Sequence, residues 1–408
     1  MRRILMALFC VLTTFAMCAC SFTSPFSVPV QPGPVTPNEE DVSDIVPANV
    51  SDVKSVNTIT YSLLTDDQKA IYDALVNCYT NFDSQVEITG LEEDIETAHH
   101  AIIADRPEIF YVNGYVTDAS TGAIIDAAKE YTVYPNYTHT KEEYDDLMAQ
   151  VNSVADGWCK NLSTSATDYE KSKYVFDTII DQAKYKTDAA YNQNMLSVFI
   201  YGQTVCGGYS QSFSYLMQKL GIPCAMITGE LSGTAHSWNV CILDNEFYLT
   251  DLTNGDSYYE VNGEKYDYYD YSYLNINPGF IPEYGVTDLF KRIQVSAKED
   301  NYYYKEGLHI ETFSDEQIDA GIQKAVDAGM PYVTLRFDEK PLEQAKQKLL
   351  NLQEMQDKFG VTHVKTSDVF NTVTLYFNMP TENQLKAEEI IAKQKAEKEG
   401  VLDENTSN

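Results

Sequence analysis

The sequence is poor in basic residues. Its 408 residues include 29 Lys and Arg against 61 Asp and Glu, which gives a formal net charge of -32. Such a polyanion is repelled by phosphate backbones and by anionic lipid headgroups. The charge therefore excludes nucleic acid as a partner and argues against broad contact with an anionic membrane surface. It favours solubility in an extracytoplasmic space and does not identify a substrate.

Paired cysteines are also lacking. Beyond Cys20 the chain has an odd number, irregularly spaced and without a CxxC motif: Cys78, Cys159, Cys206, Cys224 and Cys241. Neither a disulfide framework nor a zinc site is indicated, and one thiol can remain free for chemistry. Cys224 and Cys241 are predicted to be buried. His99 and His100 point about 100° apart on a helix and do not suit one ion, so we expect no metal and no cofactor.

The first apolar run is too short to be a permanent membrane span. It covers residues 4–16, follows Arg2 and Arg3, and leads into Met17-Cys18-Ala19-Cys20. This order is typical of a secretory signal, and it resembles a bacterial lipoprotein signal with Cys20 as the lipidated residue. We therefore predict a signal peptide over 1–19 and a lipid anchor to the bacterial cell membrane. The alternative is an ordinary secretory signal cut after Ala19 or a little later. Cys18 is a poorer lipidation candidate.

The segment after the signal is rich in proline and has no sustained periodicity. A composition of this kind cannot bury enough apolar surface to fold, so residues 20–57 are predicted to be a disordered tether. Residues 381–408 mix Lys and Glu and are predicted to be a charged, solvated tail.

Between tether and tail the patterns predict an α+β protein in three segments: an N-terminal α+β region over 58–140, a catalytic domain over 141–300 and a C-terminal α+β domain over 301–380. The expected helices cover 66–82, 91–104, 142–160, 168–184, 207–220, 315–329 and 342–359. The expected strands cover 109–112, 130–134, 224–228, 237–243, 246–249, 308–313, 332–337, 361–365 and 372–377, with a hairpin turn at Asp244-Asn245.

Tyrosines are unusually dense over residues 257–284. One interpretation is a substrate-binding rim, because tyrosine gives a large contact area at low entropic cost. The interpretation we favour is a loop packed over the core with its hydroxyls in water.

A thiol, an imidazole and a carboxylate follow one another at Cys206, His236 and Asp251, 30 and then 15 residues apart. A thiol is a weak nucleophile until a base takes its proton, and the base works once a third group fixes its tautomer and orientation. Cys206 is predicted to begin a helix, where unpaired N–H groups stabilise a thiolate. Gly207 and Gly208 are expected to leave the backbone there open to a substrate.

His236 lies at the start of one predicted strand, and Asp251 lies at the end of the next. Opposed Cβ atoms of an antiparallel pair are about 4.5–5.5 Å apart, which lets the carboxylate orient the imidazole. The three residues are therefore predicted to form one site.

The motif resembles the transglutaminase-like superfamily, in which a papain-like core packs a cysteine-bearing helix against an antiparallel sheet. The matching segments are Tyr201–Tyr209, Gly229 with His236–Val240, and Phe247–Thr253, within about residues 168–260. The resemblance implies that Cys206 is the nucleophile, His236 the base and acid, and Asp251 the orienting group. Leu252 departs from the proline common among relatives. The candidates for substrate or oxyanion contacts are Gln193, Gln203 and Trp238, together with the Cys206 backbone N–H.

These features predict a cell-surface cysteine enzyme that acts on peptide or amide bonds through a thioester, with hydrolysis as the expected outcome. Its expected partner is a peptide or protein, with cell-wall peptide included. Two alternatives stay open: a protein cross-linking transglutaminase, and a non-catalytic surface binding module on the same fold.

Overall fold

The computed structural model describes residues 58–119, 129–261, 264–280, 282 and 284–377. Cys20, the signal peptide, the tether and the charged tail lie outside these ranges. Within them the chain divides into two compact units. The first comprises the described residues through Ser257 together with Asp267–Asn301, and the second comprises Tyr258–Tyr266 with the described residues from Tyr302 onward. The predicted segments 58–140 and 141–300 both fall largely in the first unit.

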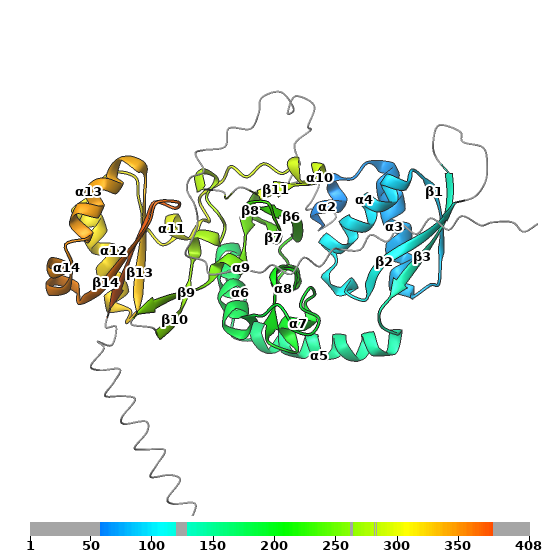
Figure 1. Cartoon of the computed structure of the whole chain (residues 1–408), viewed down its shortest axis with the longest axis horizontal. Helices are drawn as coiled ribbons and strands as arrows, with labels where there is room; N and C mark the ends of the chain where they lie inside the picture. Colours follow the sequence, from blue (N-terminus) through cyan, green and yellow to red (C-terminus); the bar gives the residue numbers. More distant parts are fainter. Residues whose placement is uncertain (1–57, 120–128, 262–263, 281, 283, 378–408) are drawn as a thin grey trace, which may run out of the picture. The chain divides into compact units, whose positions relative to one another are not determined.

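The first unit begins with helices packed beside a three-stranded antiparallel sheet of order β1-β3-β2 (Figure 1). Its elements are α2 (Ile59–Leu63), α3 (Asp66–Asn81), β1 (Val86–Gly90), α4 (Glu92–Asp105), a 3-10 turn (Pro107–Ile109), β2 (Val112–Ala119) and β3 (Lys129–Tyr137). Thr65 starts α3 with a capping box, as its sequence position predicts.

The expected strand over 109–112 is wrong. Pro107 opens a 3-10 turn, and β2 begins only at Val112. Ile109, Phe110 and Tyr111 form an apolar run because all three are buried in the core, and they do not form a strand. A short apolar run does not distinguish these two cases.

The rest of the first unit carries the cysteine-bearing helix and a four-stranded antiparallel sheet of order β11-β6-β7-β8. Its elements are α5 (Lys141–Cys159), α6 (Asp168–Gln182), β4 (Lys184–Tyr185), α7 (Leu196–Phe199), β5 (Gln203–Thr204), α8 (Cys206–Lys219), β6 (Cys224–Leu231), β7 (Thr234–Leu243), β8 (Glu246–Thr250), α9 (Leu252–Gly255), β11 (Tyr284–Val286) and α10 (Asp288–Lys291). The strands β9 (Asp256–Val261) and β10 (Glu264–Tyr269) pair with each other, and their residues Tyr258–Tyr266 belong to the second unit.

The predicted β7–β8 hairpin is confirmed. Asp244 and Asn245 both have positive φ, 46° and 73°, which is the requirement of the tight turn that matches strand twist. Alternation along β7 sends its side chains to two faces. Asn239 hydrogen-bonds to Ser210 and Ser214 of α8, whereas Trp238 packs in the apolar core on the other face. Cys224 and Cys241 are buried, as predicted.

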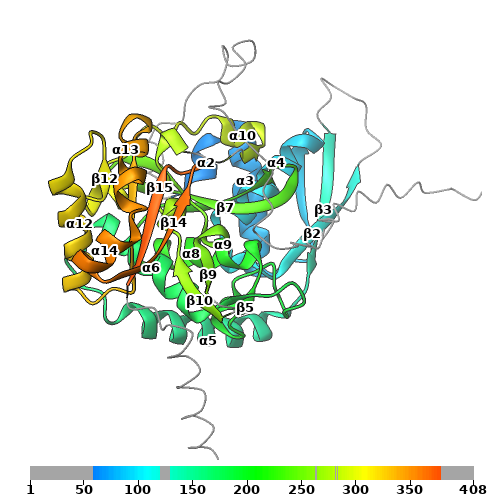
Figure 2. The ribbon, with the colours of Figure 1, turned by 60° about the vertical axis from the view of Figure 1, so that its left-hand side comes forward.

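The second unit has a four-stranded sheet of order β12-β13-β15-β14, in which β12 and β13 are parallel and the other pairs are antiparallel. Figure 2 shows α12, α13 and α14 gathered beside it. Its elements are α11 (Tyr302–Lys305), β12 (His309–Ile310), α12 (Asp315–Asp327), β13 (Tyr332–Phe337), α13 (Glu339–Leu349), α14 (Leu352–Phe359), β14 (Val361–Ser367) and β15 (Thr372–Phe377).

Two expectations for this unit need correction. The expected helix over 342–359 is two helices, because the chain leaves helical geometry at Asn351 while buried residues continue on both sides. The expected strand over 308–313 pairs only at His309–Ile310, and Ser314 then caps α12. The mixture of helices with mainly antiparallel strands confirms the α+β class.

Candidate active site

Cys206 is the first residue of α8, and Val205 before it is extended. The first-turn N–H groups of a helix have no partner within the helix, and the positive end of its dipole lies there. Both favour a thiolate over a thiol. The residue is buried, with only 8% of its surface exposed.

The two glycines after Cys206 have a different role from the one expected. Both are buried. A Cβ on Gly207 would lie 2.5 Å from the Gln193 side chain, and one on Gly208 would lie 2.0 Å from Thr204 Oγ1. Glycine is therefore needed because the 193–204 segment packs directly against the start of α8. The expectation that these glycines open the backbone to a substrate is wrong, since protein atoms already fill that space.

His236 and Asp251 are in contact, as the hairpin predicts. His236 Nε2 lies 2.8 Å from Asp251 Oδ2. Asn239 pairs with Thr250 in the β7–β8 register. Continuing that register by one residue places Asp251 diagonally across from His236, on the same side of the ladder. Asp251 is fully buried and also caps α9, where its Oδ1 accepts the backbone N–H of Asn254 at 3.2 Å.

His236 also lies near enough to Cys206 to act on the pKa of the thiol, so the three groups lie together. Because Asp251 occupies Nε2, Nδ1 is the ring nitrogen available to the thiol. The structure thus brings together all three residues that the sequence singled out. Their catalytic roles stay predictions.

The protonation states of these three side chains follow from their contacts. Burial alone would raise the pKa of Cys206, but the hydrogen bond and charge of His236, with hydrogen bonds from Ser237, lower it overall. Burial alone would lower the pKa of His236, yet the Asp251 carboxylate and the Cys206 contact raise it to about 10. Burial opposes the ionised form of Asp251, and His236 nevertheless lowers its pKa. The contacts therefore favour the thiolate–imidazolium pair over a neutral thiol beside a neutral imidazole.

Two further partners of Asp251 escaped the sequence analysis. Asn254 Nδ2 donates to Oδ2 at 2.6 Å, and the Tyr284 hydroxyl donates to the same oxygen at 2.8 Å. An Asp at the start of a helix commonly accepts the backbone N–H of the third residue after it. The contact between Asp251 and the Asn254 backbone could therefore have been predicted from the sequence. Tyr284 arrives from a distant edge strand, for which no local signal exists.

The tyrosine-rich segment matches the favoured interpretation in part. Tyr268 and Tyr271 are buried within the first unit. Tyr271 donates to Asp177 at 2.9 Å. Tyr284, in contrast, reaches the candidate site.

The three candidates for substrate or oxyanion contacts lie in different places. Gln193 is exposed and lies against Gly207, the residue after Cys206. Gln203 accepts a hydrogen bond from Lys186 at 3.1 Å, so it is engaged elsewhere. Trp238 is fully buried behind His236, and its Nε1 has no hydrogen-bond partner among the described residues. An oxyanion contact from Gln193 stays a prediction.

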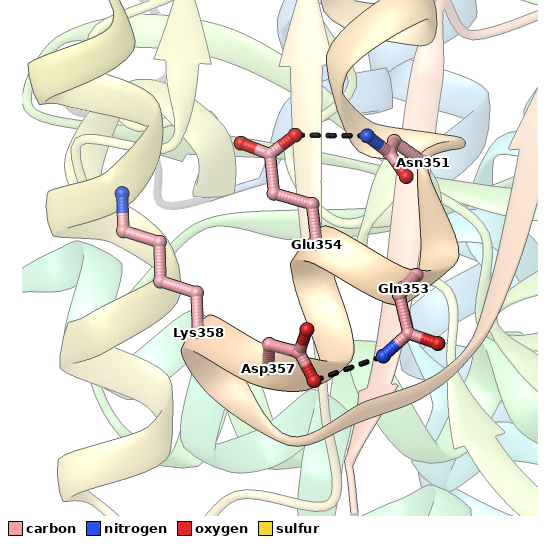
Figure 3. Close-up of a pocket in the computed structure, with 5 residues that line it drawn as sticks. All are labelled: Asn351, Gln353, Glu354, Asp357 and Lys358. Carbon is pink, nitrogen blue, oxygen red and sulfur yellow. Dashed lines mark hydrogen bonds between the residues drawn. The ribbon is translucent and has the colours of Figure 1, made fainter.

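A separate surface hollow lies on the second unit along α14 (Figure 3). Its lining consists of exposed polar side chains, namely Asn351, Gln353, Glu354, Asp357 and Lys358. Asn351 donates to Glu354 and Gln353 donates to Asp357, both at 2.9 Å. No thiol or imidazole faces this hollow, so it is a less suitable place for the predicted chemistry.

Two searches cover only the residues that the structure describes. Within them, no three His, Cys, Asp or Glu side chains gather closely enough to bind a metal ion. No helix in the same ranges combines the length and apolar character needed to cross a bilayer.

Comparison with known proteins supports the family resemblance. Residues 153–252 match the sequence profile of the transglutaminase-like superfamily core. A comparison with curated proteins found no match.

Solved structures with similarity to the chain include a TGase, at 12% identity over 36% of this chain and 47% of that chain, with a TM-score of 0.26. A candidate cysteine protease from Cytophaga hutchinsonii shares 13% identity over 38% of this chain and 66% of its own, with a TM-score of 0.24. A candidate protease from Parabacteroides distasonis shares 10% over 38% and 40%, with a TM-score of 0.19. The chain thus spans 40–66% of the length of these three structures.

The matched segment contains the start of α8 and the β7–β8 hairpin, and with them Cys206, His236 and Asp251. Over residues 153–252, the chain therefore carries a domain of the transglutaminase-like superfamily.

Proposed function

We propose that this protein is a cysteine enzyme that cleaves amide bonds in peptides through a thioester on Cys206. The observation that carries the proposal is the cluster of Cys206, His236 and Asp251, in which His236 Nε2 lies 2.8 Å from Asp251 Oδ2, the pKa of the thiol is lowered and that of the imidazole is raised. A buried thiol with no function is ordinarily neutral, and burial does raise the pKa of Cys224 in the same domain, to about 12.

The reaction begins when Cys206 Sγ attacks the carbonyl carbon and forms a C–S bond. The carbonyl oxygen then carries the negative charge, and N–H groups at the start of α8 lie beside it as hydrogen-bond donors. Collapse of this intermediate breaks the C–N bond, and the imidazolium of His236 gives its proton to the departing amine. The products of this half are a free amine and an acyl-thioester on Cys206.

The second half returns the enzyme to its starting state. Neutral His236 takes a proton from water, the hydroxide formed attacks the thioester, and the C–S bond breaks to release a carboxylic acid and the thiolate. Asp251 holds the imidazole in position through both halves. A lysine amine in place of water gives a cross-link instead. We propose hydrolysis as the main outcome and cell-surface peptide, including cell-wall peptide, as the substrate class.

The test is a screen of the full chain against peptide and wall-fragment libraries, with release of a new amine as the readout. We expect cleavage by the wild type and none by Cys206→Ala. Incorporation of a labelled amine into a glutamine peptide, without cleavage, would instead identify a cross-linking transglutaminase. Peptide binding that is equal in wild type and Cys206→Ala, with no turnover, would identify the binding module.

A thiol-directed probe tests the activation separately from the substrate. We expect the probe to label Cys206 rapidly, the His236→Ala variant to react more slowly, and the Cys206→Ala variant to lose this label. Equal labelling rates in wild type and His236→Ala would contradict activation of the thiol by the imidazole.

We also propose that the protein works outside the cell, anchored to the bacterial membrane by a lipid on Cys20. The support is the sequence order of two arginines, an apolar run and a cysteine after Ala19. Metabolic labelling with a fatty-acid analogue tests the anchor. We expect labelling of the wild type in the membrane fraction and its loss in Cys20→Ala; label retained by that variant would refute Cys20 as the attachment site.

A further inference from the structure

Tyr284 connects an edge strand to the centre of the candidate site. It is the first residue of β11, the short outer strand paired with β6 at the far side from β8. Its hydroxyl donates to Asp251 Oδ2 at 2.8 Å, the same oxygen that lies 2.8 Å from His236 Nε2. The contact spans 33 residues of sequence and joins two separate elements. One carboxylate oxygen is therefore shared by the imidazole, the phenol and the Asn254 amide.

The Tyr284 ring is held in place by stacking. Its centroid lies 4.2 Å from that of Trp238, with 17° between the planes. The ring of His236 is nearly parallel to it, at 6.4 Å and 12°. Three flat rings thus line the site in similar orientations. Such packing restricts the rotation of the tyrosine and fixes where its hydroxyl points.

Gly229 allows β11 to come this close. It pairs with Val286 of β11 on one side and with His236 of β7 on the other. A Cβ at this position would lie 2.1 Å from the Gly285 carbonyl oxygen and 2.9 Å from the Trp238 ring. The absence of a side chain on Gly229 is thus what permits the contact between Tyr284 and Asp251.

We propose that Tyr284 is a positioning residue that acts through Asp251: its hydroxyl holds the carboxylate ionised and aimed at His236, so that the imidazolium–thiolate pair persists into acid solution. The inference rests on the proposed function for its purpose. Its test reads the thiol directly and does not depend on any substrate.

The charges around Asp251 favour this role. The ionisable groups that face it are His236 from β7, Cys206 beyond it on α8, Tyr273 from the following loop and Tyr284 from β11. Burial, and then the Asp251 charge, raise the pKa of Tyr284 far above its usual range, so the phenol remains a donor at every working pH. Burial opposes ionisation of Asp251, and Tyr284 is one of the donors that lower its pKa against that effect.

Removal of the hydroxyl therefore makes Asp251 easier to protonate. Once Asp251 is neutral, the imidazolium loses its partner and the thiolate loses the imidazolium. The acid-side transition of Cys206 reactivity should move to higher pH. Only part of the effect of a hydrogen bond to a charged group reaches the thiol, so we expect a loss of about three- to tenfold in alkylation rate near about pH 5. Near about pH 8 the change should be less than about twofold.

The experiment measures iodoacetamide modification of Cys206 in the full chain across pH, followed by mass spectrometry of the peptide that contains it. Tyr284→Phe retains the ring and its stacking, so we expect it to fold. Tyr61→Phe is the matched control: it removes a phenol that donates to Asp73 at 3.2 Å on the surface, away from the site. Val286→Ala loosens β11 and leaves the Tyr284 hydroxyl in place.

The expected result is an acid-side transition moved to higher pH in Tyr284→Phe and unchanged in Tyr61→Phe and Val286→Ala. In an Asp251→Asn background, Tyr284→Phe should add no further effect, because the residue through which it acts is already neutral. An unshifted transition would overturn the inference, and so would an equal shift in Val286→Ala or a full effect of Tyr284→Phe in the Asp251→Asn background. If the protein proves not to cleave peptides, this measurement still decides the role of Tyr284.

Discussion

Replacement of Gly229 by alanine should disturb the candidate site indirectly, by displacing β11, the strand that carries Tyr284. The added methyl carbon would lie 2.1 Å from the Gly285 carbonyl oxygen, 2.9 Å from Trp238 Cη2 and 3.2 Å from the Gly285 carbonyl carbon. Ordinary contacts between such atoms begin near about 3.5 Å. The backbone of β11 must therefore move outward by about 1 Å or more, and Trp238 must also adjust.

The cost follows from these contacts. Overpacking of a well-packed interior costs about 1–3 kcal/mol, and β11 has only three residues paired with β6 to resist the displacement. For a unit of this size, about 1 kcal/mol corresponds to about 2–4 °C in Tm. We therefore expect Tm to fall by about 2–12 °C. Because an outward shift of β11 withdraws Tyr284 from Asp251, Cys206 reactivity at acid pH should fall as well.

Gly285→Ala is the matched control, since the nearest atoms to its added methyl are Glu230 Cβ at 3.6 Å and Glu230 O at 3.7 Å. Differential scanning calorimetry and iodoacetamide labelling of both variants give the comparison. We expect Gly285→Ala to behave as the wild type. If Gly229→Ala has the same Tm as the wild type and its Cys206 reacts with iodoacetamide at the same rate, the close approach of β11 does not matter and the reasoning fails.

Three further predictions concern single sites. Asp251→Asn should lower the pKa of His236, because it removes the largest contribution that raises it, and alkylation of Cys206 near about pH 7 should fall at least tenfold or so; an unchanged rate would exclude the carboxylate from thiol activation. Gly208→Ala should cost about 1–3 kcal/mol in thermal unfolding, because its methyl would lie 2.0 Å from one buried hydroxyl and 2.4 Å from another, whereas Gly157→Ala, with nothing within 4 Å, should stabilise α5 slightly. Burial raises the pKa of Asp105 from 3.8 to about 6, so the folded state binds a proton more tightly there and stability should fall as pH rises between these values. Relative to Asp105→Asn, the wild type should lose about 2 kcal/mol from about pH 4 to about pH 7 in denaturant unfolding, and parallel profiles would contradict the shift.

Local chemistry explains what the sequence predicts well. The turn at Asp244-Asn245 favours a hairpin by itself, and a hairpin places the ends of its strands side by side. That alone brings Asp251 to His236. The start of α8 is likewise set by residues next to Cys206 in the chain. The central part of the site is therefore built from short-range signals, and short-range signals are what a sequence reveals.

The remainder of the site depends on contacts that no local pattern records. Tyr284 belongs to a strand of three residues, too short for its alternation to be visible. The glycines illustrate the same limit, since Gly207 suggests an open backbone in the sequence and proves to be packed against Gln193. A missing side chain is equally consistent with space for a substrate and with space already filled, and only the fold distinguishes them.

The site draws its parts from three pieces of backbone, and this separation has a mechanistic consequence. The helix start holds Cys206, the hairpin holds His236 and Asp251, and the edge strand holds Tyr284. A change that removes the Tyr284 hydroxyl, or withdraws it from Asp251, leaves the nucleophile and its base in place, so it should shift the pH at which the thiol is reactive without abolishing reactivity. A change in the hairpin should weaken reactivity at every pH, because the imidazolium itself is lost. The pH profile of Cys206 labelling, and not its magnitude at one pH, is therefore the measurement that separates a positioning defect from a catalytic one.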